Sequence, residues 1–403
     1  MLSGIRVLDL ADESAWLAGK ILAETGADVV KVERPGGDPG RVGPYLGEIE
    51  DPDRSLRWLA LNTSKRGVTL DWRSEKGAAM LRGLAERADV LIETGAPGTL
   101  DAAGVGWEAL RQVNPRLVYC AVTPFGRTGP RAQWRAHDLV VVSMGGNAVM
   151  TGDADRPPVR CSLPTAYLHA GPEVAAGVAM ALWSRETTGL GQLVDISLHE
   201  IQLSTLVTGP GQHAHAPRRQ RRTGAVMGRT REIWRAADGW ISFGLRGGPA
   251  RIPNLVATVA LMDESGMAPE WLRSYDWEHY NHNTLSDEEI ARFEAAFGAF
   301  FATKTRRFLY EEALERRMML APCNDAREIS EQPQLRSRDL FTTVEYPEFA
   351  TAFEHPDFFA KNTGPRVGIR GRAPRVAEHN AEIYAELGLG ESDLAGLSSE
   401  GVV

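Results

Sequence analysis

Hydrophobic and polar positions alternate along the first hundred residues in the pattern of βαβ units. Short apolar runs rich in Val, Ile and Leu indicate buried strands, and segments of about a dozen residues with helical periodicity separate several of them. Because parallel strands are joined by right-handed crossovers, this pattern predicts a mostly parallel sheet. The predicted strands are IRVLDLA, ADVVKVE, GVTLDW, DVLIET and, further on, RLVYCAVTPFG, and the predicted helices are SAWLAGKILAETG and EKGAAMLRGLAERA.

The pattern changes after the fifth strand. GPEVAAGVAMALWSRETTG predicts a long apolar helix that ends at Gly189. QLVDISLHEIQLSTL begins as a strand or enters a helix, and the pattern leaves both open. REIWRAADGWISFGL predicts a hairpin with its turn at Asp238 and Gly239. The remaining expectations are a linker over about 208–230, helices from about 250 to 318, a Pro-rich polar tail from 322 and a last helix in EHNAEIYAELGL.

Composition narrows the function classes. The 403 residues are 43% hydrophobic and 24% charged, which is normal for a soluble globular protein. A net charge of −8 argues against a general nucleic-acid or membrane-surface role. The beginning, MLSGIRVLDL, has no charged leader, and no window reaches the roughly 18 apolar residues of a membrane span, so we expect a cytoplasmic protein without a nucleic-acid or membrane partner.

Neither cysteine nor histidine spacing indicates a metal site. Cys120, Cys161 and Cys323 are far apart and form no CxxC pair, which makes a disulfide framework or zinc site improbable. His213 and His215 lie two residues apart in the predicted linker, with no third ligand close by. We therefore expect no bound metal.

Three segments follow predicted parallel strands, where ligands bind in open sheets: KVERPGGDPGR, IETGAPGTL and TPFGRTGP. None is a GxGxxG fingerprint, so a standard dinucleotide site is not supported. They share glycine with a nearby arginine or lysine, which suits a diphosphate. Gly-rich βα turns are also common for structural reasons alone, and each segment by itself leaves that alternative open.

Read in order, motifs from the whole chain resemble the family III CoA-transferases, the group that includes formyl-CoA and carnitine CoA-transferases and the α-methylacyl-CoA racemases. The matching motifs are GIRVLDL, GADVVKVERPGGDPGR, NTSKRGVTLD, GTLDAAGV, NPRLVYCAVTPFGRTGP, HDLVVVSMGG, RETTGLGQLVDISLHE, ADGW and AEHNAEIYAELGL.

The resemblance implies an α/β fold with a large Rossmann-like parallel-sheet domain, a smaller α+β domain and an interlocked dimer whose active sites lie between subunits. The large domain is expected over 1–205 and 346–403, the small domain over 229–321, and linkers over 206–228 and 322–345. It also implies that coenzyme A and acyl-CoA are substrates, with no permanently bound cofactor. Transfer passes CoA from an acyl-CoA to a small carboxylic acid.

The resemblance fails at the position of the nucleophile. In the family, an aspartate in a pattern close to PxRxGxPxADLxAG attacks the thioester and then carries CoA. Laid on PVRCSLPTAYLHAG, this pattern places Tyr167 at the aspartate, and a phenol with an ordinary pKa of about 10 is a poor nucleophile. Cys161, His169 and Glu173 are nearby alternatives. Each also has a structural interpretation, as a small buried hydrophobe, a hydrogen-bonded histidine and a helix-start acid.

Several implied CoA contacts are also changed. Thr94 and Gly95 stand at an Asn-Phe pair that would hold adenine, and Ala102 stands at a phosphate-facing arginine. SAW, residues 14–16, replaces AGP, so we expect Trp16 to crowd a ligand loop. The implied CoA-binding residues are Arg34, Arg41, Lys65, Glu93, Thr94, Gly126 and Arg127.

His137 in AHDL occupies the place of a histidine in the racemases. Racemases need one base on each face of the acyl α-carbon, and the second base corresponds to the aspartate replaced by Tyr167. His137 is therefore a candidate catalytic residue, or a hydrogen-bonded residue of an interface or core.

The leading hypothesis is one subunit of a two-gene CoA-transferase, paired with a paralogue that keeps the aspartate, as in enzymes resembling succinyl-CoA:benzylsuccinate CoA-transferase. A homodimer is the alternative assembly. The alternative functions are an autonomous racemase, isomerase or transferase that uses His137, and a non-catalytic binding protein. The basic run PRRQRR, residues 217–222, would meet an acidic partner surface or CoA phosphates.

Overall fold

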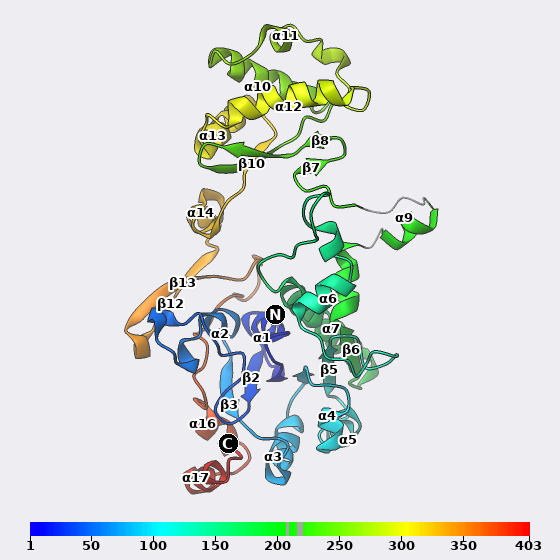
Figure 1. Ribbon diagram of the computed structural model, residues 1–403. Coiled ribbons are helices and arrows are strands. Elements are labelled where there is room, and N and C mark those ends of the chain that lie inside the picture. Colours follow the sequence, from blue (N-terminus) through cyan, green and yellow to red (C-terminus); the bar gives the residue numbers. More distant parts are fainter. Residues whose placement is uncertain (207–208, 216–220) are drawn as a thin grey trace. The chain divides into compact units, whose positions relative to one another are not determined.

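The computed structural model in Figure 1 describes residues 1–206, 209–215 and 221–403. The chain divides into two compact units: Met1–Ala148, Arg160–Arg218 and Pro333–Val403 form the first, and Val149–Val159 with Arg219–Gln332 the second. Parts of the predicted linker 206–228 and of the basic run 217–222 lie outside the described residues, namely 207–208 and 216–220. The segment predicted as the second linker, 322–345, contains α14 (Ala326–Glu331), α15 (Pro333–Ser337) and the start of β12 (Phe341–Tyr346).

A six-stranded parallel sheet forms the centre of the first unit, with the order β3-β2-β1-β4-β5-β6. Its strands are β1 (Arg6–Leu10), β2 (Asp28–Glu33), β3 (Arg66–Thr69), β4 (Val90–Glu93), β5 (Val118–Thr123) and β6 (Leu193–Ser197). All five predicted strands are present, and the α/β fold class is confirmed. The ambiguous segment contains both structures, because β6 continues directly into α8 (Leu198–Ile201).

The strand order places a switch point between β1 and β4. The chain builds β2 and β3 on one side of β1 and then returns to add β4, β5 and β6 on the other side. Loops that leave two such neighbouring strands diverge, which opens a crevice at their carboxyl ends.

Helices bury both faces of the sheet, which explains why its strands are almost continuously apolar. Val7 of β1 packs in one hydrophobic cluster and the next residue, Leu8, in the other. The first cluster includes α1 (Trp16–Glu24), α6 (Asp138–Met144) and α7 (Thr165–Thr188); the second includes α3 (Glu75–Ala85), α4 (Thr99–Ala102), α5 (Trp107–Val113) and α16 (Asn380–Ala385).

The carboxyl-terminal end of the chain completes the first unit. The His379 amide donates to the Gly67 carbonyl at 2.9 Å, and Tyr384 Oη donates to the Thr69 carbonyl at 2.7 Å, which ties α16 to β3. The other elements of this unit are α2 (Leu56–Leu61), α9 (Gly209–His215), β13 (Thr351–Pro356), which pairs with β12, and α17 (Glu391–Ser399).

Helix α7 begins earlier than its apolar pattern predicts. Its predicted end is confirmed, since Gly189 caps it with a left-handed φ of +73°. Its beginning is Thr165, six residues before the predicted start at Gly171. Tyr167 therefore lies in the first turn of the helix.

The second unit contains the predicted hairpin, formed by β9 (Ile233–Ala236) and β10 (Gly239–Phe243). Trp234 Nε1 donates to the Phe243 carbonyl at 2.6 Å beneath an aromatic core that includes Phe297 and Phe301. The remaining elements are β7 (Val226–Met227), β8 (Thr230–Arg231), α10 (Ile252–Glu264), α11 (Glu270–Arg273), α12 (Asp287–Phe301), α13 (Arg306–Arg316) and β11 (Leu320–Pro322).

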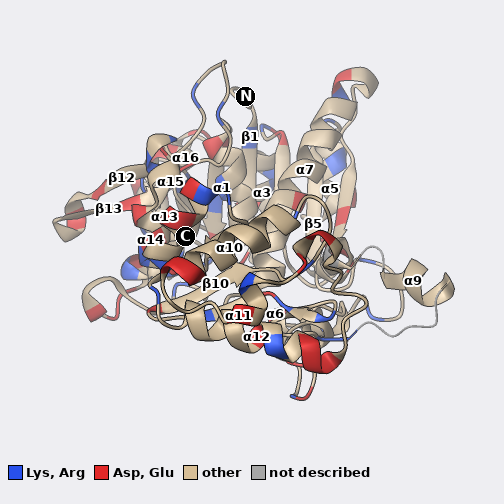
Figure 2. Cartoon of the chain, turned by 90° about the horizontal axis from the view of Figure 1, so that it is seen from above, with Lys and Arg blue, Asp and Glu red and all other residues tan. Residues whose placement is uncertain are grey.

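Figure 2 shows Lys and Arg interspersed with Asp and Glu along the described ribbon, consistent with a net charge of −8 spread over many mixed pairs. Among the described helices, none combines the length and the apolar character that crossing a bilayer requires.

Candidate functional site

A cavity of about 450 Å³ lies at the carboxyl ends of β1, β4 and β5, where the strand order opens the sheet. Three residues singled out in the sequence, Thr94, His137 and Tyr167, line it together. They come from the loop after β4, the residue before α6 and the first turn of α7. The tertiary structure thus gathers them at one site.

Tyr167 is held in the wall of this cavity. Its side chain is 9% exposed, and its Oη accepts a hydrogen bond from the Asp138 amide at 3.1 Å. Burial raises the pKa of Tyr167 to about 12, with the charges of Glu13 and Asp12 acting in the same direction against the Asp138 hydrogen bond. The phenol therefore stays protonated at neutral pH.

The amino ends of α6 and α7 are locked to each other. While the Asp138 amide donates to Tyr167, Asp138 Oδ1 accepts from the Ala166 amide at 2.8 Å. His137 is the residue before α6; it is exposed and makes no capping hydrogen bond with its side chain. Both hydrogen bonds are made by Asp138, so they fix the backbone directly after His137, which lines the cavity.

Glu93 ends β4 as a buried carboxylate. Its Oε2 accepts from the Gly95 amide at 2.6 Å, and its Oε1 lies 3.5 Å from Tyr119 Oη and 3.4 Å from Arg127 Nη1. Burial raises the pKa of Glu93 to about 7, against the lowering effects of the Gly95 hydrogen bond and the Arg127 charge. Glu93 does not line the cavity; it supports the loop that does.

Arg127 connects three elements through internal contacts. Its Nη2 lies 3.3 Å from Asp101 Oδ2, and its backbone amide donates to Asp195 at 3.0 and 3.1 Å. Asp101 directly precedes Ala102, the exposed residue at the family's phosphate-facing arginine. The guanidinium implied for CoA is thus shared between two carboxylates of its own chain.

Thr94 and Gly126 shape the two loops beside the cavity. Thr94 Oγ1 accepts from the Asp12 amide at 2.9 Å, which joins the loops after β1 and β4. Gly126 has a φ of +83°, a conformation that favours glycine, and leaves room beside Asp195 and Ser197.

The ammonium group of Lys65 is buried and donates three hydrogen bonds inside the protein. Its Nζ donates to Asp9 Oδ2 at 2.8 Å, to the Trp16 carbonyl at 2.8 Å and to Asn62 Oδ1 at 2.7 Å. Burial lowers the pKa of Lys65 to about 8, with Asp9 opposing the shift and Lys31 reinforcing it. All three ammonium hydrogens already have acceptors, so Lys65 has none to offer a ligand.

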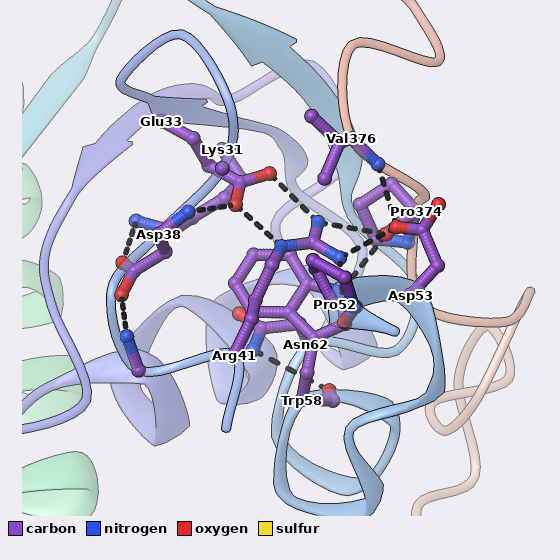
Figure 3. A network of polar contacts seen from close by, with 12 residues as sticks. Lys31, Glu33, Asp38, Arg41, Pro52, Asp53, Trp58, Asn62, Pro374 and Val376 are labelled. Atoms are coloured by element: carbon purple, nitrogen blue, oxygen red, sulfur yellow. Dashed lines mark hydrogen bonds and ion pairs between the residues drawn. The ribbon is translucent and has the colours of Figure 1, made fainter. Parts of the chain in front are cut away.

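Arg41 is the centre of the buried network in Figure 3. Its Nε and Nη2 bind Glu33 at 2.6 and 2.8 Å, and its Nη1 binds Asp53 at 2.9 Å. Nη2 also donates to the Pro374 carbonyl at 3.1 Å, and the guanidinium lies 3.5 Å from the centre of the Trp58 ring. These contacts join β2 to the carboxyl-terminal segment.

Trp16 lies against the loop after β2, and its crowding of a ligand loop stays a prediction. Its Nε1 donates to Asp38 Oδ2 at 3.3 Å, and a Cβ added to Gly40 would come within 2.6 Å of the indole. Arg34 in the same loop is exposed, and its Nε donates to the Gly37 carbonyl at 3.2 Å.

The alternative nucleophiles and ligands do not line the cavity. Cys161 is exposed, not buried as expected, and Glu173 is also exposed. His169 is half-buried, and its Nδ1 has no hydrogen-bond partner among the described residues. His213 and His215 belong to α9, and the part of the chain that is described contains no group of three or more potential metal-ligating side chains.

A second cavity, of about 440 Å³, lies at the opposite, amino ends of β1, β2 and β3. Its three arginines have internal partners: Arg66 binds Asp28 at 2.5 Å, Arg372 binds Glu378 at 2.6 Å, and Arg370 Nη2 donates to the Ala23 and Ala27 carbonyls at 2.7 and 2.6 Å. The Arg370 bonds and an ion pair of Arg66 with Glu382 at 2.6 Å hold the carboxyl-terminal segment on this unit, which is a structural role.

Sequence reasoning missed Asp12, Glu13, Trp134 and Arg135, which also line the cavity at the switch point. Asp12 and Glu13 directly follow β1, so their place after a strand at the switch point was the available signal. Trp134 and Arg135 lie in an irregular segment whose path no periodicity reveals.

Comparison with known proteins gives a consistent result. The family described as CoA-transferase family III matches residues 2–380. The chain is 32% identical to the succinyl-CoA:(R)-benzylsuccinate CoA-transferase subunit BbsE of Thauera aromatica, over 100% of this chain and 98% of the relative. It is 30% identical to the formyl-CoA:oxalate CoA-transferase of Streptomyces avermitilis, over 100% and 99%. A crystal structure of a CAIB/BAIF family protein from Brucella suis has a TM-score of 0.82 at 26% identity, covering 96% of this chain and 99% of that one.

Proposed function

The chain belongs to CoA-transferase family III, and from this premise we propose that it is the subunit of a heteromeric CoA-transferase that lacks its own nucleophile. The complex moves CoA from an acyl-CoA donor such as succinyl-CoA to a carboxylic acid. The aspartate that carries CoA belongs to a paralogous partner chain.

The position of Tyr167 carries the proposal. Its Oη lies in the cavity wall, where it accepts a hydrogen bond from Asp138, and its pKa of about 12 leaves roughly one molecule in 10⁵ ionised at pH 7. A phenol also cannot form the acyl anhydride and CoA thioester that a carboxylate forms. Transfer through this position is therefore excluded by chemistry.

The two other carboxylates of the cavity are already engaged. Glu13 is ion-paired with Arg57. Asp12 Oδ1 accepts hydrogen bonds from the Ser14 amide at 3.0 Å and the Ser14 hydroxyl at 2.6 Å. A carboxylate whose oxygens are already held by hydrogen bonds or by an ion pair is a weaker nucleophile.

Two observations support a heteromeric assembly: the name of one relative, and the internal ion pairs made by the residues expected to bind CoA. One relative is named as a subunit of its enzyme. In this chain Lys65 and Arg41 form ion pairs with internal carboxylates, and Arg127 lies between the carboxylates of Glu93 and Asp101. Both observations are expected if this chain needs a partner chain to bind and transfer CoA.

A second candidate, an autonomous racemase or isomerase, is favoured by the placement of His137. Its exposed imidazole and Tyr167 line the same cavity, so a base and a weak acid share one site. A non-catalytic binding protein of the same fold is the third candidate.

The deciding experiment compares the chain alone with the chain co-expressed with an aspartate-bearing paralogue. CoA transfer from succinyl-CoA to a panel of acids is followed by mass spectrometry, and hydroxylamine or borohydride traps any enzyme thioester. We expect transfer only by the complex, with the thioester on the partner. A fully active, trappable chain alone contradicts the proposal. If the chain alone epimerises an acyl-CoA and His137→Ala abolishes this activity, the second candidate is supported instead. If both preparations lack acyl-CoA binding and turnover, the third candidate is supported.

A further inference from the structure

Trp134 presents an exposed aromatic surface at the cavity. The side chain is 55% exposed although it lines the site. Its ring is positioned by Phe125, whose centroid lies 6.2 Å away at an interplanar angle of 89°, and Phe125 in turn packs against His199. An indole held in place while half of it faces solvent is suited to receive another ring.

Two arginines beside this indole are free to bind an anion. Arg135 lines the cavity, and the Arg131 guanidinium lies 5.2 Å from the centre of the Trp134 ring. In the described residues neither guanidinium has a carboxylate or hydrogen-bond partner, in contrast to Arg41 and Arg127. Guanidinium groups favour carboxylates, so these two arginines select negative charge.

Two acidic residues, Asp12 and Glu13, also line the cavity. Asp12 and Glu13 lie close enough to Tyr167 that their charges raise the pKa of its phenol. A bound anion is therefore attracted by Arg135 and repelled by Asp12, while the ion pair with Arg57 offsets the charge of Glu13. The lining also includes the apolar residues Val122, Pro124 and Leu198.

We propose that this cavity binds an aromatic carboxylic acid without turning it over, with the ring against Trp134 and the carboxylate on Arg131 and Arg135. The inference rests on the proposed function, because it assigns a ligand class and a non-catalytic role to the same cavity. A volume of about 450 Å³ lies within the range of small-molecule sites of roughly 300 to 1,000 Å³.

The test measures binding to the purified chain by isothermal titration calorimetry, with probes that separate ring from charge. Phenylacetate supplies both, cyclohexylacetate replaces the planar ring by a puckered one, and phenylacetamide removes the charge. Adenosine 3′,5′-bisphosphate represents the nucleotide part of CoA, the other source of a planar ring with negative charge. We expect phenylacetate to bind at least about fivefold more tightly than either analogue, and more tightly than the nucleotide.

The variants assign the contacts. Trp134→Ala is expected to weaken phenylacetate binding about tenfold, and Trp134→Phe to restore most of it. Trp183→Ala is the matched control, because Trp183 is 79% exposed on α7 and does not line the cavity. Arg131→Gln with Arg135→Gln is expected to weaken phenylacetate about tenfold while leaving phenylacetamide unchanged.

Three results overturn the inference: no binding of phenylacetate, equal binding of cyclohexylacetate, or an unchanged affinity in Trp134→Ala. Tighter Trp134-dependent binding of the nucleotide overturns the assignment to an acid. The measurement needs neither partner nor turnover. Its failure is therefore distinct from failure of the proposed function, which is recognised by transfer and a trapped thioester on the chain alone.

Discussion

Replacing Glu93 with glutamine is expected to remove a pH-dependent loss of stability from the wild-type chain. Glu93 is 2% exposed, and burial raises its pKa from 4.5 to about 7 even with Arg127 3.4 Å away. Between these two values the folded chain holds a proton that the unfolded chain has released. The contribution of Glu93 is thus fully present below pH 4.5 and is lost as the pH rises through about 7.

The size of the loss follows from the shift. A difference of 2.5 pKa units, 7 minus 4.5, at about 1.4 kcal/mol per unit gives about 3 to 4 kcal/mol in total. Most of it, about 2 to 3 kcal/mol, falls between pH 5 and pH 8. Glutamine is neutral at every pH in this range and can still accept a hydrogen bond from the Gly95 amide. The stability of the Glu93→Gln variant therefore does not fall with pH through this group.

The assay is urea unfolding of wild type and Glu93→Gln at pH 5 and pH 8, followed by circular dichroism. Because other groups titrate equally in both proteins, the change in their stability difference between the two pH values isolates Glu93. Glu386→Gln is the control: Arg6 lowers the pKa of Glu386, so its difference from wild type should be nearly constant over this range. An equal stability difference between wild type and Glu93→Gln at pH 5 and pH 8 would refute the reasoning.

Two further substitutions test the buried charges. Gly19→Ala places a Cβ 2.1 Å from Asp9 Oδ2 and 2.8 Å from Lys65 Nζ. We expect it to lower the free energy of unfolding, measured with urea, by about 3 kcal/mol. An unchanged stability would show that the pair of Asp9 and Lys65 is not fixed there. Arg41→Gln leaves the Glu33 carboxylate buried without its cation. We expect the free energy of unfolding to fall by about 3 to 5 kcal/mol in the same assay. A variant of unchanged stability that loses only acyl-CoA affinity would show that Arg41 binds the ligand instead.

Local pattern was sufficient for the elements of the sheet. The five apolar runs became five parallel strands, and Gly189 became the cap of α7. The predicted hairpin of β9 and β10 formed, but its turn is at Ala237 and Asp238, one residue earlier than predicted, because Gly239 already pairs with Ala236 as the first residue of β10. The beginning of α7 was misplaced because its first turn, around Tyr167, is fixed by hydrogen bonds to Asp138 from a distant segment.

The candidate site was predicted in part. Thr94, His137 and Tyr167 were identified from motifs, and the structure gathers them at one cavity. The partners of Lys65 and Arg41 could not be predicted. A motif records that a cation is present, whereas its availability depends on which carboxylates the fold brings within reach, here Asp9 and Glu33.

The sequence by itself determined the family and the parallel sheet, because motifs and strand periodicity are local properties. Only the tertiary structure decided which charges neutralise one another and which stay free. Ion pairs such as Arg41 with Glu33 depend on distances between segments that the order of residues does not fix. The same distances leave the arginines beside Trp134 without an acidic partner among the described residues.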